Sequence, residues 1–186
     1  MAQTSDLPTQ TVCVGETQPY TLVDPVTGPP TANYSYQWSI TGGGTFVGGT
    51  NTGISININW TTVGVHTVTV VATDNITNCQ DSPIDVVVTV EDLASPPAAT
   101  SPLPICLGDP NPQMLASTGG GTGNWVFNWY NVDPATTPGA TPIATSVNTF
   151  IPTPTTVGIY TFWVTETNSG TNCEGGASSF TFEIIS

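Results

Sequence analysis

Short runs of alternating apolar and polar residues recur along this 186-residue chain. In YSYQWSI (34–40) the rings and the isoleucine fall on one face, while serine and glutamine fall on the other. ISININW (54–60) and SFTFEI (179–184) repeat the pattern. Residues two apart share a face of a β-strand, so each run predicts a strand with one buried face. No stretch of ten residues shows helical spacing, and the chain is therefore predicted to be all-β, with antiparallel sandwiches.

The chain also repeats itself, with four landmarks that recur in the same order about 91 to 94 residues later. The matched positions are Cys13 and Cys106, Trp38 and Trp129, Gly64 and Gly158, and Cys79 and Cys173. This repeat predicts two tandem β-sandwich domains, residues 1–92 and 105–186. Residues 93–104 between them are rich in proline and alanine, which predicts a short and fairly stiff linker.

The four cysteines are expected to form one disulfide in each repeat, Cys13 with Cys79 and Cys106 with Cys173. Each bond would close a loop of about 66 residues and contribute roughly 4 kcal/mol in the chain-entropy model. Disulfides place a protein in an oxidising, extracellular setting. The alternative is a zinc site, but the chain has no Cys-x-x-Cys pair and its single histidine is His66.

A family resemblance rests on Trp38 and Trp129 together with the runs Gly64-Val65-His66 and Gly158-Ile159-Tyr160. These motifs resemble immunoglobulin-like and PKD-like sandwiches, with the ring at the place of their tyrosine corner. The later cysteine follows the ring by about 13 residues instead of two. This spacing, with the Cys-x-Gly opening, is similar to the repeats of large surface adhesins of gliding bacteria with type IX secretion. The resemblance implies a non-enzymatic adhesion or filament role at the cell surface.

Composition excludes several classes of partner. The chain has no Lys or Arg and 13 Asp and Glu, a formal net charge of −13. Without cationic side chains it is not expected to bind nucleic acid or to be held on anionic lipid by a basic patch. No run reaches the length of a membrane span, so no membrane insertion is expected. We expect the sequence to be part of a longer secreted protein, since its first residues do not resemble a signal peptide.

The inventory of reactive residues argues against an enzyme. His66 occupies the position of Tyr160 in the other repeat, so it is predicted to be a packed corner ring and not a catalytic base. The acid pairs Asp81/Asp85 and Glu91/Asp92 flank the predicted last strand and begin the linker, where solvated edges explain them. The glycine runs at 41–45 and 118–123 lack a following helix and a lysine, so they are predicted to be turns.

Calcium is the one metal with a candidate set of ligands. It prefers oxygen ligands, and Asp74, Asn75, Glu91 and Asp92 would supply them if they converged near the joint between the domains. The chain carries no Asp-x-Asp-x-Asp ladder or EF-hand pattern, so ordinary surface acids remain the simpler interpretation. No other cofactor is expected.

Two aromatic residues of the second repeat are candidate contact residues. Alternation places Tyr130 and Trp163 on the outward face of two adjacent strands. An exposed aromatic patch indicates an interaction site, either for a neighbouring repeat or subunit or for extracellular polysaccharide. Burial by the loop 131–146 is the alternative. The rival functions are therefore a self-assembling extracellular fibre subunit, with residues 2–11 pairing to a neighbour, and a carbohydrate-binding accessory module of a secreted enzyme.

Overall fold

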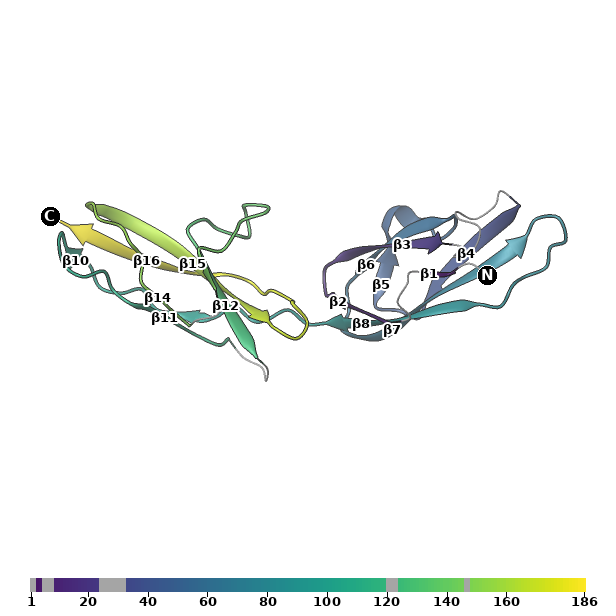
Figure 1. The fold of residues 1–186 in the computed structure, drawn as a ribbon, viewed down its shortest axis with the longest axis horizontal. Coiled ribbons are helices and arrows are strands. Elements are labelled where there is room, and N and C mark those ends of the chain that lie inside the picture. Colours follow the sequence, from purple (N-terminus) through teal and green to yellow (C-terminus); the bar gives the residue numbers. More distant parts are fainter. Residues whose placement is uncertain (1–2, 5–8, 24–32, 120–123, 146–147) are drawn as a thin grey trace. The chain divides into compact units, whose positions relative to one another are not determined.

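A computed structural model describes the chain except residues 1–2, 5–8, 24–32, 120–123 and 146–147. The chain divides into two compact units, Met1–Asp92 and Leu93–Ser186. Each unit is a pair of β-sheets (Figure 1). Apart from one 3-10 turn, Val47–Gly49, the regular structure of the described residues is β-strand. The all-β prediction is confirmed.

The first unit is an immunoglobulin-like sandwich of two four-stranded sheets. One sheet has the order β1-β3-β6-β5 and the other β2-β8-β7-β4. This arrangement corresponds to the two sheets of immunoglobulin-like domains, with the first strand split between them. The strand bounds are β1 Gln3–Thr4, β2 Thr9–Cys13, β3 Thr17–Val23, β4 Tyr34–Ile40, β5 Gly44–Phe46, β6 Ser55–Trp60, β7 Gly64–Asp74 and β8 Ile84–Glu91.

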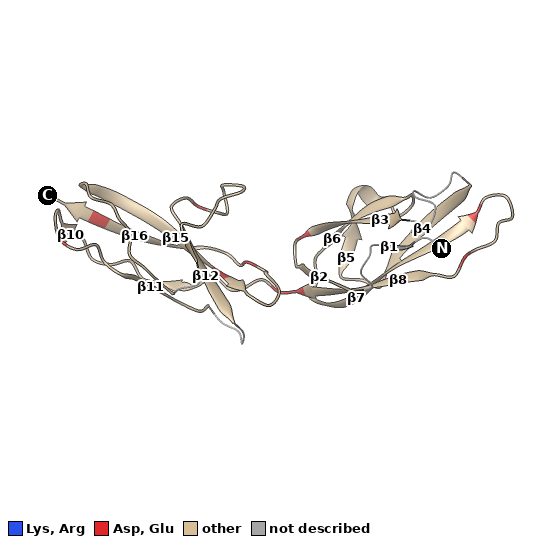
Figure 2. Ribbon diagram, viewed as in Figure 1, with Lys and Arg blue, Asp and Glu red and all other residues tan. Residues whose placement is uncertain are grey.

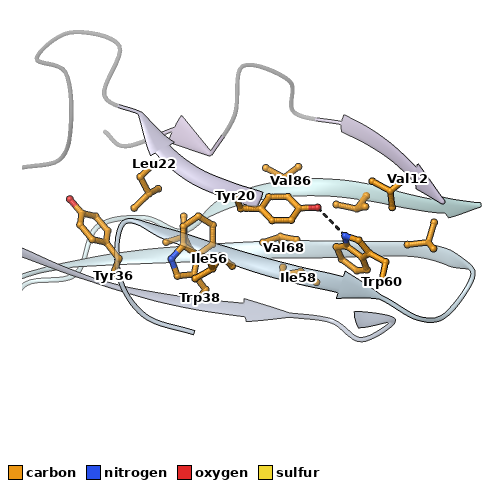
Figure 3. Close-up of a cluster of buried hydrophobic side chains, with 13 residues drawn as sticks. Val12, Tyr20, Leu22, Tyr36, Trp38, Ile56, Ile58, Trp60, Val68 and Val86 are labelled. Carbon is orange, nitrogen blue, oxygen red and sulfur yellow. Dashed lines mark hydrogen bonds between the residues drawn. The ribbon is translucent and has the colours of Figure 1, made fainter. Parts of the chain in front are cut away.

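The core of the first unit lies between the sheets and is built around two tryptophans (Figure 3). Trp38 and Trp60 are fully buried, and each indole N–H has an acceptor. Trp38 Nε1 donates to the Gly53 carbonyl at 2.9 Å, and Trp60 Nε1 donates to the Tyr20 hydroxyl at 3.2 Å. Burial with satisfied N–H groups is how a sandwich accommodates such large rings.

The second unit repeats this architecture with a five-stranded sheet, β10-β16-β15-β12-β13, facing a three-stranded sheet, β14-β11-β9. Its core is richer in phenylalanine. Trp129 lies between Phe150 and Phe180, with ring centroids at 5.4 Å and 5.3 Å. The strand bounds are β9 Ala98–Ala99, β10 Ile105–Cys106, β11 Met114–Ser117, β12 Trp125–Tyr130, β13 Ala144–Thr145, β14 Thr149–Phe150, β15 Gly158–Asn168 and β16 Ser178–Ile185.

The predicted alternation holds in the middle of the strands and fails at their ends. In β4 the inward positions Tyr36 and Trp38 are buried, but Tyr34, the first residue of the strand, is 38% exposed. Ile54 precedes β6 and is also exposed, whereas Ile56 and Ile58 are buried. The alternating pattern continues beyond the edge of the core, so apolar residues at these ends point to the inward face but are not covered by the opposite sheet.

The segment predicted as a linker is partly structured. Within residues 93–104, Ala98 and Ala99 form β9 and pair with Ser117 and Ala116 of β11. This segment belongs to the second unit, where it supplies an edge strand. The proline and alanine content predicted stiffness but gave no sign of this pairing.

Acidic side chains occur in both units, and no basic side chain balances them anywhere in the sequence (Figure 2). Among the described residues, no helix has the length and apolarity needed to cross a membrane.

Candidate functional site

The residue taken as a corner ring has that role in both units. In the second unit the Tyr160 hydroxyl donates to the carbonyl oxygen of Thr156, four residues earlier, at 2.8 Å. In the first unit His66 Nε2 lies 3.0 Å from the carbonyl oxygen of Thr62, also four residues earlier. A carbonyl can only accept, so this nitrogen carries the hydrogen. The prediction that His66 is a packed corner ring is confirmed.

The His66 ring is held on its other sides as well. It stacks on Trp60 with ring centroids 5.7 Å apart. It also lies against Gly43, where an added Cβ would come within 2.1 Å of Nε2. The glycine run at 41–45 therefore makes room for this ring in the first unit. Residues 120–123 of the matching run lie outside the described residues.

The cysteines are not arranged as the sequence predicted. Cys13 pairs with Glu91 at the end of β8, while the Cys79 carbonyl accepts a hydrogen bond from the Asp74 N–H at 2.9 Å at the far end of β7. β7 and β8 are antiparallel neighbours, so these positions are separated by the length of the 11-residue β7. At about 3.3 Å per residue this is roughly 30 Å, and a disulfide requires Cα atoms within about 7 Å.

The second unit has the same separation. Cys106 pairs with Ile185 near the end of β16, whereas the Cys173 carbonyl accepts from the Asn168 N–H at the far end of β15. The expected bonds Cys13–Cys79 and Cys106–Cys173 are therefore wrong for this structure. Cys13 and Cys173 are each in disulfide form, whereas Cys79 and Cys106, their expected partners within the repeats (Cys79 for Cys13, Cys106 for Cys173), are exposed free thiols. The sequence places one cysteine of each repeat on the first strand and the other in the loop before the last strand, but it does not show that these two positions lie at opposite ends of the sandwich.

The two aromatic contact candidates are neighbours, but they do not form an exposed patch. Tyr130 on β12 pairs with Trp163 on β15, as adjacency of the strands predicted. Tyr130 is only 3% exposed, and Trp163 is half-buried. The chain after β12 returns as β13, with the Ile143 N–H donating to the Trp129 carbonyl at 2.7 Å. The outward-facing platform for a sugar ring that the sequence suggested is thus absent from this pair.

Tyr130 is instead part of a polar network around Glu174. Its hydroxyl donates to Glu174 Oε1 at 2.7 Å, and Asn128 Nδ2 donates to the same oxygen at 3.3 Å. The Thr165 hydroxyl also donates to this oxygen. Burial, followed by the hydrogen bond and the charge of Glu174, raises the pKa of Tyr130 to about 12. The neutral, donating hydroxyl is the form that this network stabilises.

A second carboxylate of the same strand is fully buried. Glu166 of β15 is 0% exposed, and its Oε2 accepts from the Gly119 N–H at 2.9 Å. Its Oε1 has no hydrogen-bond partner among the described residues. The sequence analysis missed this residue, although alternation from Tyr160 through Phe162 and Val164 puts position 166 on the inward face. An acidic residue at an inward position of the alternating pattern was the signal in the sequence that could have identified it.

The acidic residues considered for calcium do not converge. Asp74 and Asn75 lie at one end of β7, while Glu91 lies at the end of β8 that pairs beside the other end of β7. The Asp74 carboxylate caps its own turn, with Oδ1 accepting from the Ile76 and Thr77 N–H groups at 2.7 Å and 3.2 Å. No group of three or more His, Cys, Asp or Glu suited to a metal occurs in the described part of the chain.

An open hollow in the second unit is a candidate for a small-molecule site. It lies beside Tyr160 and Phe162, and its other lining residues are Asn131, Ile143, Phe150 and the segment 153–156. The side chains that line it offer amide, hydroxyl and apolar groups, without an acid, histidine or thiol. Such a lining supplies neither a general base nor an activated nucleophile.

Comparisons with known proteins return structural likenesses only. No protein-family model and no curated protein matches the chain. The solved structures to which it is similar include human mucin-like protocadherin EC1-2, at 11% identity and a TM-score of 0.38, covering 100% of this chain and 98% of that one. They include the C-terminal 282-residue fragment of intimin in complex with the intimin-binding domain of its translocated receptor, at 14% identity and a TM-score of 0.48, covering 99% and 63%.

A third similar structure is that of the chicken CNTN1 FN1–FN3 domains, at 10% identity and a TM-score of 0.42. The match covers 99% of this chain and 65% of the chicken CNTN1 chain. At these identities a likeness concerns the fold alone, which the strand order already defines: two tandem immunoglobulin-like sandwiches.

Proposed function

We propose that the chain is a non-enzymatic, two-repeat segment of an extracellular adhesin or surface filament of a bacterium. The observation that carries the proposal is that both units are built to one plan, with a cysteine-bearing turn at each end of the same hairpin. We expect such repeats to act as spacers, whose function depends on their number and connection more than on any one site.

Two further observations support an extracellular setting. Half of the cysteines are in disulfide form, and such bonds persist in oxidising compartments. The chain carries −13 formal charges with no basic residue, which disfavours sideways association of many copies at close range. The resemblance to repeats of type IX-secreted gliding adhesins points to the same role.

The absence of a platform at Tyr130 and Trp163 disfavours the carbohydrate-binding alternative. The fibre-subunit alternative retains support from the exposed thiols of Cys79 and Cys106 at opposite ends of the repeats. Exchange of the N-terminal strand is not the route that the structure favours, because β2 pairs in parallel with β8 of its own sheet over Thr9–Cys13.

Antibody fragments raised against the 186-residue chain test the proposal on the cells that produce it. We expect the fragments to bind intact cells and to reduce their attachment to a surface, while fragments against a cytosolic protein do neither. Binding that appears only after the cells are lysed would refute the extracellular role. Surface binding without any effect on attachment would favour a filament spacer over a direct adhesive contact.

A further inference from the structure

The two repeats differ at one core position next to the corner ring. Both carry the run Thr-Thr-Val-Gly shortly before that ring, at residues 61–64 and 155–158. The residue directly before the run is Trp60 in the first unit and Pro154 in the second. The strands agree with this match, because β6 pairs with β3 and β14 pairs with the corresponding strand β11.

In the first unit, Trp60 fills the space beside the corner ring. Its indole is fully buried in the core (Figure 3) and stacks on His66, with ring centroids 5.7 Å apart and an interplanar angle of 21°. Strand β5 covers it, since Gly44 pairs with Trp60 and a Cβ on Gly44 would come within 2.9 Å of the indole ring. A second flat ring stacked on the corner ring is therefore part of the core of this repeat.

In the second unit, the same space is open. Pro154 has no ring that reaches the face of Tyr160, and β14 is the edge strand of its sheet, whereas its counterpart β6 is covered by β5. The hollow described above lies here, between Pro154, Tyr160 and Phe162, and has a volume of about 700 Å³. Sites for small molecules or single side chains commonly have volumes of about 300–1,000 Å³.

The walls of the hollow are held in place by contacts within the second unit. Asn111 Nδ2 donates to the carbonyl oxygens of Pro152 and Pro154, at 3.0 Å in both cases. Phe150 packs edge-on against Phe162, with ring centroids 5.5 Å apart. The hollow is therefore already formed, and a ligand does not have to order its walls when it binds.

The lining of the hollow favours a neutral ring. None of its lining residues is charged, although the chain has a formal net charge of −13. The aromatic wall suits a flat ring in offset or edge-to-face contact. Thr153, Thr155 and Asn131 add hydroxyl and amide groups, which can accept a hydrogen bond from the N–H of an indole or the O–H of a phenol.

We propose that this hollow receives a tryptophan or tyrosine side chain of a partner protein, in the place that the Trp60 indole takes in the first unit. Such rings, inserted in preformed pockets, supply much of the binding energy of protein interfaces. Pro152 and Pro154 have no N–H to offer to an added strand, so the contact is made through the side chain. The inference deepens the adhesin role proposed above and rests on it only for its biological setting.

The test uses the isotope-labelled 186-residue chain and the probe N-acetyl-tryptophanamide, followed by nuclear magnetic resonance. We expect saturable shifts at Ile143 and Thr155, which line the hollow, and none at Thr61, which follows Trp60 in the first unit. N-acetyl-leucinamide and methyl glucoside are the control probes. Both should bind about tenfold more weakly, because neither has an aromatic ring to stack on the wall.

Two kinds of variant localise the binding. Pro154→Trp supplies the indole from within the chain and should abolish the shifts. Ile143→Ala removes part of the lining and should weaken binding about fivefold. Ile151→Ala is its matched control, because Ile151 and Ile143 are 55% and 44% exposed but only Ile143 lines the hollow. This pair decides the matter if Pro154→Trp does not fold.

Four results would overturn the inference. The first is the absence of saturable shifts with N-acetyl-tryptophanamide, and the second is equal binding of N-acetyl-leucinamide. The third is binding of methyl glucoside at the hollow that is as tight as that of the aromatic probe, which would assign the hollow to a sugar. The fourth is an equal loss of binding in Ile143→Ala and Ile151→Ala. None of these results bears on antibody binding to intact cells, so the two proposals fail separately.

Discussion

At the scale of the residue, the corner ring shows how a turn is fixed by one side chain. Tyr160 reaches back four residues to Thr156 and stacks beside Phe182, with ring centroids 5.6 Å apart. His66 makes the equivalent contact in the first unit with a different ring. The position therefore requires a flat side chain with a donor at its tip, and both tyrosine and histidine satisfy that requirement.

Substitution Tyr160→Phe removes only the donor at that tip. We expect it to lower the free energy of unfolding of the second unit by about 0.5–1.5 kcal/mol, the usual contribution of one hydrogen bond. Urea unfolding followed by tryptophan fluorescence measures the change. Ile159→Thr is the matched control, because Ile159 is 70% exposed and threonine is also β-branched. An equal loss in both variants would contradict a specific role for the hydroxyl.

Gly175 is a second position where a single added atom is expected to lower the stability of the fold. A Cβ at this position would come within 1.9 Å of the Ala94 carbonyl oxygen, and backbone cannot move aside as a flexible side chain can. We expect Gly175→Ala to cost about 1–3 kcal/mol in the stability of the second unit. Gly170→Ala, where the nearest atom is 3.3 Å away, should change stability by less than about 1 kcal/mol. Equal thermal unfolding midpoints for the two variants would refute this close packing.

At the scale of the element, the paired strands β12 and β15 carry a buried tyrosine, Tyr130, and a buried acid, Glu166. The Tyr130 hydroxyl has a raised pKa of about 12, and Tyr20 in the first unit has one of about 12, in both cases chiefly through burial. The unfolded value is 10.0. The folded state therefore holds the phenolic proton more tightly than the unfolded state does.

This linkage predicts alkaline sensitivity. A raised folded pKa contributes stability that is fully present below the unfolded pKa of about 10 and is lost as pH rises toward about 12. Urea midpoints should therefore fall over that range in both units. Tyr130→Phe should reduce the fall in the second unit and leave that of the first unchanged, with the Tyr20→Phe variant as the converse control. A fall of the same size in Tyr130→Phe and the parent would show that other groups cause it.

The sequence predicted the strands themselves better than the segments and side chains that cover them. Period-two alternation found the middles of β4, β6 and β16, because one face of each strand is covered by the opposite sheet. It also implied that Tyr130 faces solvent, which was wrong because β13 and the Glu174 carboxylate cover that position. Glu174 follows Cys173 in a loop, and nothing in the phase of one strand indicates which loop side chain will reach it.

The pairing of the cysteines was unpredictable for a related reason. Tandem repeats with two cysteines each allow bonds within a repeat or between repeats, and spacing is compatible with both. The decision depends on where the two positions lie along β7 or β15, which requires the register of the sheet. The repeated turns were visible in the sequence, but the separation of about 30 Å was not.

At the scale of the whole molecule, the net charge and the positions of the acidic residues determine the expected response to calcium. The formal charge of −13 is spread over two units, and the acids considered for calcium lie at opposite ends of a hairpin. We expect that millimolar calcium leaves both thermal unfolding midpoints unchanged relative to a chelator. Magnesium at equal ionic strength is the control for screening. A rise specific to calcium would contradict the arrangement described for Asp74 and Glu91.

The most direct test of the proposed role is immunogold electron microscopy of the producing cells, with antibodies against the purified 186-residue chain. The account predicts gold particles along extracellular fibres at the cell surface, spaced by one or two sandwich lengths. Gold confined to the cell interior, or absent from any surface structure, would contradict it.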